Sequence, residues 1–418
     1  MKVAIETYGC TLNQADSDII RSILENNGIE ITEDGEDVRI INTCTVKSTT
    51  EQKILNRIRT LRSKKLIVTG CMASANKDLI LKAAPKASIL TASNIADIAD
   101  AVRSVYNGKQ IIKDSIKIDD RISYLEPRGV IARIPISEGC LSNCSFCETK
   151  LARGPLHSFD ISLIRKAVEI SLRNGAKEIQ LTAQDVGAYG RDKGTNIAKL
   201  VEDISQIDGN FMIRIGMMNP EHIHLYIDEL IEQYRSNSKL YHFIHLPLQS
   251  GSDRILKLMK RRYSYDDYKS YIKELKDKVP DITIETDMIV GFPTESEEDF
   301  NRSIEAIKEI RFDVINVSRY SVRPHTEASM MRNIRTEIIK ERSIIMSRIV
   351  REIEAERNLE YVNKNVLALI TEKSSNCYKG RTYNYKQLVI DNERVKLGDT
   401  VVANIISANS TSLFGKIL

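Results

Sequence analysis

The stretch GCLSNCSFC, residues 139–147, carries three cysteines in the spacing C-x3-C-x2-C. A structural zinc site takes four nitrogen or sulfur ligands, and the next candidate, His157, lies ten residues beyond Cys147. Three thiolates suit a 4Fe-4S cluster with one iron left open, because a closed cluster takes four cysteines. The stretch therefore predicts an iron–sulfur site on Cys140, Cys144 and Cys147. A zinc loop completed by His157 is the alternative.

Strands and helices alternate around this stretch, which follows the first of six predicted strands. This pattern predicts a central partial (β/α)6 barrel over residues 130–356, with its chemistry at the carboxyl ends of the strands. A long amphipathic helix is expected to follow over residues 335–360. The predicted barrel strands are residues 131–137, 178–182, 212–216, 241–246, 282–289 and 314–320.

Residues 1–110 also alternate, with predicted strands at residues 3–5, 38–41, 66–68 and 88–90. This pattern predicts an N-terminal parallel α/β sheet domain. Cys10, Cys44 and Cys71 each follow a strand within five residues. Because the carboxyl ends of parallel strands share one edge, these thiols are expected to converge there. Three buried and inert cysteines are the alternative.

A connector over residues 111–129 is predicted between the first domain and the barrel domain. The last segment, residues 357–418, differs from both because its apolar runs are short and are separated by turn residues. Short predicted strands at residues 366–370, 387–390, 400–406 and 412–414 indicate a small all-β barrel of a kind that often binds nucleic acid. This segment holds nine Lys and Arg against five Asp and Glu, whereas the rest of the chain is balanced. Its basic and tyrosine side chains would combine phosphate contacts with base stacking, although some tyrosines could belong to the barrel core. They are Lys373, Lys379, Arg381, Lys386, Tyr378, Tyr383 and Tyr385.

Composition sets the class of protein. The 418 residues are 42% hydrophobic and 28% charged, which is typical of globular chains. No apolar run approaches the length of a membrane helix, and the first residues become acidic too soon for a signal peptide, so a cytoplasmic location is expected. Seven cysteines without an export signal favour metal or redox chemistry over disulfides, and Cys377 is expected to be a bystander.

Several motifs together resemble the methylthiotransferases of the radical S-adenosylmethionine superfamily. TYGCTLNQADS (residues 7–17), INTC (41–44) and VTGCM (68–72) are similar to the three N-terminal cysteine motifs of that family. HLPLQSGS (245–252) and TDMIVGFPTE (286–295) are similar to its barrel motifs. GRTYNY (380–385) resembles the entry to its RNA-binding TRAM barrel. The resemblance covers nearly the whole chain.

This resemblance implies a reaction, two 4Fe-4S clusters and S-adenosylmethionine. The reaction would place a methylthio group on an unactivated carbon, at C2 of an adenine in the nucleic-acid members, with no side chain as acid or base. Cys140, Cys144 and Cys147 would hold the cluster that cleaves S-adenosylmethionine. Cys10, Cys44 and Cys71 would hold an auxiliary cluster that carries the sulfur. The implied partners are the anticodon stem-loop of tRNA, an electron donor and a sulfur source, and the protein is expected to be a monomer.

The stretch TKLARG, residues 149–154, resembles the archaeal and eukaryotic branch, which acts on N6-threonylcarbamoyladenosine at adenosine-37 of tRNA. Lys150 and Arg153 would then suit the carboxylate of that nucleoside, unless they bind a carboxylate of the cofactor or a neighbouring domain. Isopentenyladenosine tRNA and a ribosomal protein side chain are alternative targets within the family. A non-catalytic RNA-binding protein with structural metal is the alternative from another class.

Residues that could contact the cofactor or the RNA follow from their positions. Polar residues at strand ends also serve as caps and turns, so cap and turn roles are the alternative for the cofactor candidates. The candidates for S-adenosylmethionine are Phe146, Gln184, Asp185, Arg214, Asn219, His245, Gln249 and Gly291. The candidates for RNA are Lys150, Arg153, Lys379, Arg381, Tyr383 and Lys386.

Overall fold

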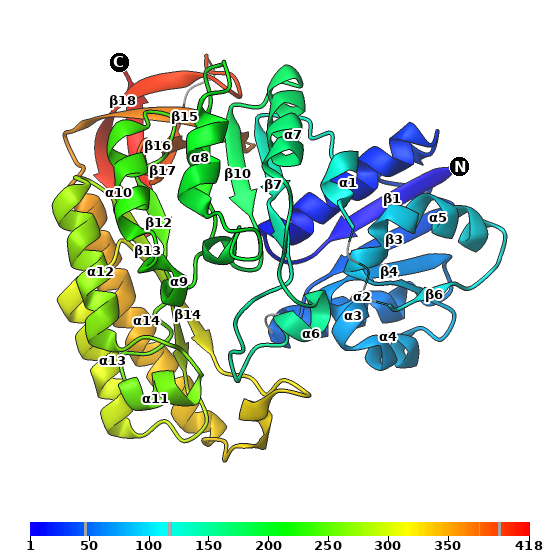
Figure 1. Ribbon diagram of the computed structural model, residues 1–418, viewed down its shortest axis with the longest axis horizontal. Helices are drawn as coiled ribbons and strands as arrows, with labels where there is room; N and C mark the ends of the chain where they lie inside the picture. The colour runs from blue at the N-terminus through cyan, green and yellow to red at the C-terminus, as the bar shows by residue number, and fades with distance from the viewer. Residues whose placement is uncertain (46–47, 116, 118, 376, 392–393) are drawn as a thin grey trace.

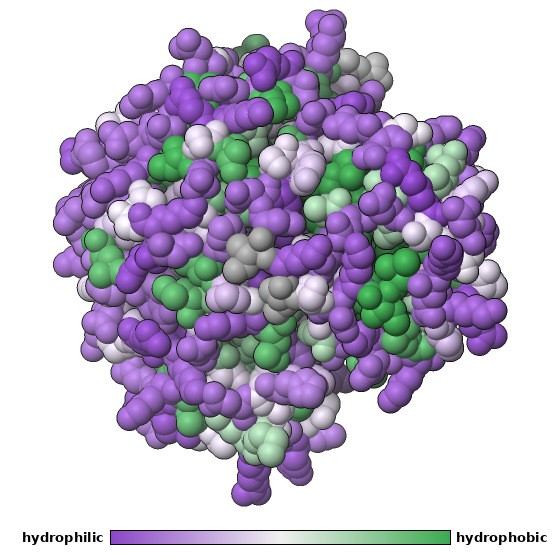
Figure 2. Space-filling view, turned by 45° about the vertical axis from the view of Figure 1, so that its right-hand side comes forward, coloured by the Kyte–Doolittle hydropathy of each residue, from purple (hydrophilic) through white to green (hydrophobic). Residues whose placement is uncertain are grey.

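The computed structural model describes residues 1–45, 48–115, 117, 119–375, 377–391 and 394–418. It has an N-terminal sheet domain, a central partial barrel and a C-terminal β-barrel (Figure 1). This confirms the predicted α/β architecture. Figure 2 shows mostly hydrophilic residues on one face of the molecule, with separate hydrophobic patches between them. Within the described residues, no helix is both long and apolar enough to cross a membrane.

The N-terminal domain is a six-stranded parallel sheet in the order β2-β1-β3-β4-β5-β6. Strands β3 and β4 are almost entirely buried, as expected for a parallel sheet with helices on both faces. Two strands were not predicted, β2 and β6, because two residues leave no pattern in the sequence. The strands are β1 (Lys2–Thr7), β2 (Glu30–Ile31), β3 (Val38–Thr43), β4 (Leu66–Gly70), β5 (Ser88–Leu90) and β6 (Ile112–Lys113), and the helices are α1 (Thr11–Asn26), α2 (Ser48–Thr60), α3 (Cys71–Ala75), α4 (Lys77–Ala83) and α5 (Ile98–Tyr106).

The central domain contains the six predicted strands as two parallel three-stranded sheets, β7-β10-β11 and β12-β13-β14. A single parallel bridge from Ile213 to Leu240 joins the two sheets. Capping boxes at Ser264 and Ser296 fix the starts of two long helices, α12 and α13. The strands are β7 (Ile131–Pro135), β10 (Glu178–Thr182), β11 (Met212–Ile215), β12 (Phe243–His245), β13 (Thr283–Val290) and β14 (Val314–Arg319), with a short antiparallel pair of β8 (Ser137–Glu138) and β9 (His157–Ser158). The helices are α6 (Thr149–Arg153), α7 (Ile161–Arg173), α8 (Ile197–Ser205), α9 (Pro220–Ile223), α10 (Ile227–Ser236), α11 (Asp253–Leu258), α12 (Tyr265–Lys278) and α13 (Glu297–Ile310).

The C-terminal domain follows the long helix α14 (Thr336–Leu359) and is a closed five-stranded barrel in the order β15-β16-β17-β19-β18. Ile370, Leu388 and Ile405 lie in its small core. Strand β16 was not predicted, because Gly380 and its basic neighbours gave no apolar run. The strands are β15 (Asn365–Lys373), β16 (Tyr378–Thr382), β17 (Gln387–Ile390), β18 (Thr400–Ala408) and β19 (Leu413–Ile417).

The two flanking domains contact different parts of the central barrel. Helix α1 of the N-terminal domain packs against β7, and α3 packs against α6, near the carboxyl ends of the barrel strands. The turn between β16 and β17 contacts the amino ends instead, where the backbone N–H of His242 donates to Tyr383 O at 3.0 Å. Figure 1 shows the C-terminal barrel and α6 at opposite ends of the central domain.

Candidate functional site

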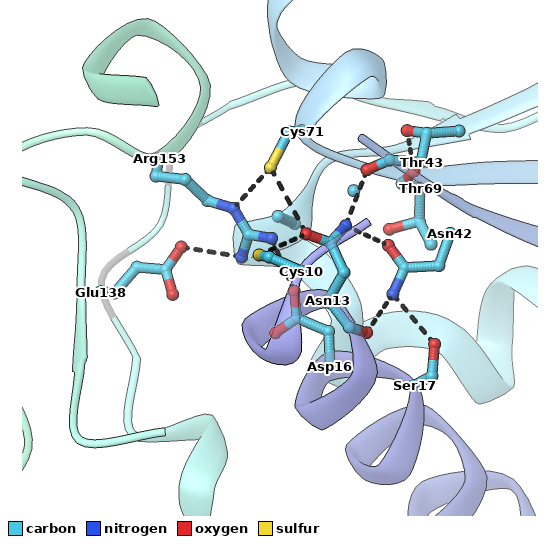
Figure 3. Close-up of polar contacts among 12 residues, drawn as sticks. Cys10, Asn13, Asp16, Ser17, Asn42, Thr43, Thr69, Cys71, Glu138 and Arg153 are labelled. Carbon is cyan, nitrogen blue, oxygen red and sulfur yellow. Dashed lines mark hydrogen bonds and ion pairs between the residues drawn. The ribbon is translucent and has the colours of Figure 1, made fainter. Parts of the chain in front are cut away.

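The first cysteine set, Cys10, Cys44 and Cys71, lies at one edge of the N-terminal sheet. Cys10 precedes α1, Cys44 follows β3 and Cys71 begins α3 directly after β4. Asn13 brings two of them together, because its Oδ1 accepts hydrogen bonds from Cys10 Sγ at 3.4 Å and Cys71 Sγ at 3.9 Å (Figure 3). Its Nδ2 in turn donates to Asn42 Oδ1 at 3.1 Å. The predicted convergence of Cys10 and Cys71 is therefore present in the structure.

Burial controls the chemistry of Cys71. It raises the pKa of the Cys71 thiol to about 12, and the nearby Cys10 and Cys44 raise it as well, while Arg153 opposes them. A buried thiol of this kind is a poor free nucleophile but a suitable metal ligand, because a bound metal removes its proton. Gly70 allows the close packing here: at its φ of +88°, a Cβ would lie 2.4 Å from Thr43 O.

Arg153 connects the first cysteine set to the barrel. Its Nε donates to Cys71 Sγ at 3.2 Å, its Nη2 pairs with Asp16 Oδ2 at 2.7 Å and its Nη1 pairs with Glu138 Oε1 at 3.1 Å (Figure 3). Arg121 pairs with the same two carboxylates, and both arginine side chains are buried. These contacts correct the expectation that Arg153 binds RNA: its guanidinium is fully used between the two domains, which is the neighbouring-domain alternative.

The second cysteine set, Cys140, Cys144 and Cys147, lies in the loop after β8. Burial raises the pKa of Cys140 to about 12, and the negative charges of Asp185 and of the other two cysteines raise it as well. Arg261 Nη1 donates to Cys144 Sγ at 3.5 Å. Gly139 lets the loop pass close to its own return, because a Cβ at its φ of +73° would lie 1.9 Å from Pro155 O.

The donor sets do not match a single metal ion. Among the described residues, no three His, Cys, Asp or Glu side chains are arranged to hold one. His157, the fourth ligand of the zinc alternative, instead contacts Asp120 at 3.4 Å and packs edge-on against Phe159. Each cysteine set has an arginine that donates to one of its sulfurs, Arg153 to Cys71 and Arg261 to Cys144, and a cationic donor of this kind suits an anionic thiolate cluster.

Two of the S-adenosylmethionine candidates, Asp185 and Asn219, lie next to the loop of the second cysteine set. Asp185 Oδ1 accepts from the backbone N–H groups of Gly187 at 3.0 Å and Asn219 at 2.9 Å, so Asp185 caps the short helix that follows it. Asn219 has a similar role, because its side chain accepts from the first turn of α9. Asn219 Nδ2 also donates to Ser142 Oγ at 3.0 Å, which connects it to the cysteine loop. Phe146 packs edge-on against Phe292 at 6.4 Å.

The remaining cofactor candidates differ in environment. Gln184 and Gln249 each have a buried Oε1 with no hydrogen-bond partner among the described residues, so both can serve a ligand. His245 Nε2 contacts Asp287 Oδ2 at 3.1 Å; burial lowers the pKa of His245, but Glu285 and Asp287 outweigh it and raise the value. Gly291 packs against α14, where a Cβ would lie 2.5 Å from Ile339 Cγ1.

The predicted RNA contacts of the C-terminal domain lie mainly at its junction with the barrel. Lys386 Nζ pairs with Asp313 Oδ1 at 3.0 Å and is buried. Burial lowers the pKa of Lys386, although Asp313 opposes this shift. The position of Lys386 inside the junction corrects the expectation that it contacts RNA at the surface. Tyr383 contacts His242 Nε2 at 2.9 Å, and Arg381 stacks on the Tyr385 ring at 4.8 Å.

Two predicted contacts remain at the surface. Lys379 pairs with Glu372 at 2.8 Å, and Lys150 Nζ donates to Asn143 Oδ1 at 2.7 Å. Both lysines are half-buried, so part of each side chain remains accessible. Lys150 lies on the cysteine side of the barrel, whereas Lys379 lies on the C-terminal barrel, so the two would contact different parts of an RNA.

Sequence reasoning missed the charged residues that join the domains. Asp16, Arg121 and Glu138 form the buried network with Arg153, and Glu51 pairs with Arg323 across the same interface at 2.5 Å. Asp16 stands within a quoted cysteine motif, so a signal existed for that residue. The others have no local pattern, because their partners come from other domains.

Comparisons with known proteins identify the same three parts. Family models match residues 2–92 (uncharacterized protein family UPF0004), residues 134–307 (radical SAM superfamily) and residues 359–418 (TRAM domain). A solved radical S-adenosylmethionine methyltransferase from Kitasatospora setae, TsrM, has the same fold over 79% of this chain and 77% of its own, with a TM-score of 0.58 at 12% identity.

Full-length relatives give the family. The probable threonylcarbamoyladenosine tRNA methylthiotransferase of Pyrococcus horikoshii is 42% identical over the whole of both chains. The human threonylcarbamoyladenosine tRNA methylthiotransferase is 31% identical over 99% of this chain and 74% of its own. A tRNA-2-methylthio-N(6)-dimethylallyladenosine synthase of Fervidobacterium nodosum is 32% identical over 100% of this chain and 99% of its own. The chain therefore belongs to the methylthiotransferase family of radical SAM proteins.

Proposed function

We propose that this protein is a tRNA-modifying enzyme that places a methylthio group on C2 of N6-threonylcarbamoyladenosine at adenosine-37. Archaeal relatives named for this nucleoside are 36–42% identical, and those named for dimethylallyladenosine are 31–32% identical. A ribosomal protein side chain as target has no support among these relatives. The dimethylallyl nucleoside is the second candidate.

The observation that carries the proposal is a contact between the first cysteine set and the helix that follows the second. Arg153 lies six residues after Cys147 and donates to Cys71 Sγ at 3.2 Å, which supports a placement of both sets at the same domain junction. Cys140, Cys144 and Cys147 would hold one 4Fe-4S cluster, and Cys10, Cys44 and Cys71 would hold the other. When bound, the clusters and S-adenosylmethionine supply the electron, the hydrogen-abstracting radical and the transferred sulfur.

The chain's own residues bind and orient in this proposal. Gln184 and Gln249, with their unpartnered oxygens, would bind S-adenosylmethionine inside the barrel. Arg153 and Arg261 donate to cysteine sulfurs and would stabilise the negative charge of each cluster.

The test is anaerobic reconstitution with iron and sulfide, followed by incubation with S-adenosylmethionine, dithionite and tRNA. Mass spectrometry of the digested nucleosides should show the gain of a methylthio group on threonylcarbamoyladenosine. tRNA that lacks this nucleoside but carries isopentenyladenosine is the matched control. Modification of the control tRNA in place of the first would assign the protein to the dimethylallyl branch.

The cellular setting follows from the reaction. An enzyme that acts on tRNA is expected in the cytoplasm, and it needs an electron donor and a source of sulfur. The anticodon stem-loop is the expected RNA partner, and we expect the protein to act as a monomer. Sedimentation of the reconstituted protein with and without tRNA measures the oligomeric state.

A further inference from the structure

A cavity of about 460 Å³ lies inside the partial barrel, and Arg214, one of the cofactor candidates, is among the residues that line it. Its volume is in the range of small-molecule sites. Thr11 and Gln14 of α1 line one end, and Thr11 directly follows Cys10 of the first cysteine set. Arg214 of β11 and Arg381 of β16 line the other end, at the junction with the C-terminal barrel. The cavity therefore extends from the cysteine side toward the floor of the barrel.

Two arginines in this cavity share one aromatic ring. The guanidinium carbons of Arg214 and Arg381 lie 5.1 Å and 4.8 Å from the centroid of the Tyr385 ring. Tyr385 is itself held by Glu178, whose Oε1 accepts from its hydroxyl at 2.9 Å, and by Gln180 at 3.2 Å. Stacking on a fixed ring holds both cations in place without neutralising them.

Neither arginine has an ionic partner among the described residues. Arg214 Nε is buried and makes no hydrogen bond there. A buried donor without a partner is costly, and two positive groups beside one ring also repel each other. This arrangement points to an anion as the missing partner.

The carboxylates of the cavity are engaged elsewhere. Glu285 accepts from Asn316 at 2.8 Å, and Asp313 pairs with Lys386 at 3.0 Å. Glu354 accepts from a backbone N–H at 2.9 Å. Arg133 and Lys386 also line the cavity, but they pair with Asp18 and Asp313. The cations that lack an ionic partner among the described residues of the lining are therefore Arg214 and Arg381.

We propose that Arg214 and Arg381 bind the carboxylate of the threonyl group on the modified adenosine. This inference rests on the proposed function. C2 and N6 lie on the same edge of adenine, on either side of N1, but the threonyl carboxylate is several bonds beyond N6. A base that presents C2 to the cysteines therefore leaves this carboxylate several ångströms farther along the cavity. The floor of the barrel, where the two arginines lie, is then the place that the substituent reaches.

A phosphate of the RNA is a weaker explanation of the same charges. The polymer backbone stays at the surface, and a smaller hollow of about 210 Å³ at the surface of α1 shares Gln14 and Arg133 with the cavity. That hollow suits the entry of one nucleoside, whereas the floor lies beyond it. A dimethylallyl group has no charge, so the same two arginines would also discriminate between the two nucleosides.

The experiment pairs Arg214→Gln and Arg381→Gln with two tRNAs. One carries threonylcarbamoyladenosine, and in the other its carboxylate has been coupled to methylamine. We expect the enzyme without substitutions to prefer the tRNA with the free carboxylate by roughly 30-fold or more in kcat/KM and in tRNA affinity. The reason is that the methylamide has no negative charge to pair with the two arginines. Each variant should lose most of this preference. Arg302→Gln, on exposed α13 and paired with Glu298, should keep it.

The outcomes separate this inference from the proposed function. Equal losses on both tRNAs would mean a phosphate contact or a structural role, and would overturn the assignment. If the unmodified enzyme modifies neither tRNA, the proposed function fails, while the binding preference still tests the two arginines. Formation of 5′-deoxyadenosine without tRNA and the circular dichroism spectrum identify a variant that has not folded. Arg214→Lys, which keeps the positive charge, should recover part of the preference for the acid and replaces Arg214→Gln in the test if the glutamine variant does not fold.

Discussion

The two cysteine sets reach similar chemistry by different routes. The second set is contiguous in the sequence, and a single loop after β8 supplies all three thiols. The first set follows three different strands and spans about sixty residues of sequence, and a parallel sheet brings these strand ends to one edge. The second set is therefore fixed by local backbone, whereas the first depends on the sheet and on a buried ionic network with the barrel. Substitutions should affect the two sets differently.

Loss of a cysteine should have the largest effect. Cys144→Ala should remove about half of the bound iron and all formation of 5′-deoxyadenosine, because the cluster that binds S-adenosylmethionine loses a ligand. Cys44→Ala should remove the other half and all methylthiolation, yet leave 5′-deoxyadenosine formation. Iron analysis and chromatography of the products measure both. Cys377→Ala is the control, and an effect of that substitution on iron would show that the ligand sets are wrong.

Loss of Arg153 should have the next largest effect, and only on the first set. Arg153→Met leaves Asp16 and Glu138 buried with one cation fewer, which should cost about 3–5 kcal/mol in the free energy of unfolding. Urea unfolding monitored by circular dichroism measures this cost.

Two controls sharpen that prediction. Arg261→Met removes an arginine beside the second set that has no carboxylate partner among the described residues, so its cost should be smaller. Arg302→Met, at an exposed i,i+4 pair, should change stability by less than about 0.5 kcal/mol. An equal cost for Arg153→Met and Arg261→Met would remove the distinction between the two sets.

The smallest expected effect is on the pH dependence of the N-terminal domain. Partial burial would raise the pKa of Glu6 in β1, but hydrogen bonds from Arg57 and Arg39 outweigh it and bring the pKa down to about 2. A carboxylate with a lowered pKa stabilises the fold above its unfolded value of 4.5, and this contribution is lost as the pH falls toward 2. Because Glu6 is partly exposed, the loss should be only about 1 kcal/mol.

Substitution of Glu6 isolates this contribution. Glu6→Gln should flatten the pH dependence of stability between pH 5 and about pH 2.5, measured by thermal unfolding at several pH values. Glu30→Gln, at an exposed and longer pair with Lys2 in the neighbouring strand, is the control. His245 in the barrel, whose pKa is raised, should act in the opposite direction and lose its contribution as the pH rises. The same acid dependence in both glutamine variants would contradict the role of Glu6.

Local and non-local features explain what the sequence could predict. The spacing of Cys140, Cys144 and Cys147 was visible directly, and the alternation of strands and helices predicted both parallel domains. The network around Arg153 was invisible, because Asp16 belongs to another domain and meets Arg153 only when the domains dock, and Glu138, fifteen residues before Arg153, shows no pattern with it. Lys386 was expected at the surface for the same reason: its partner Asp313 belongs to another domain.

The turn between β16 and β17 has a consequence for how this protein can be divided. Tyr385 and Lys386 belong to the C-terminal barrel, yet they close the floor of the central one and contact Glu178 and Asp313 there. Deletion of the last sixty residues would remove the predicted RNA-binding domain, and it would also expose the buried charges of the central barrel to solvent. A chimera that exchanges this module between relatives must carry along the matching barrel residues, so the two parts have to change together during evolution.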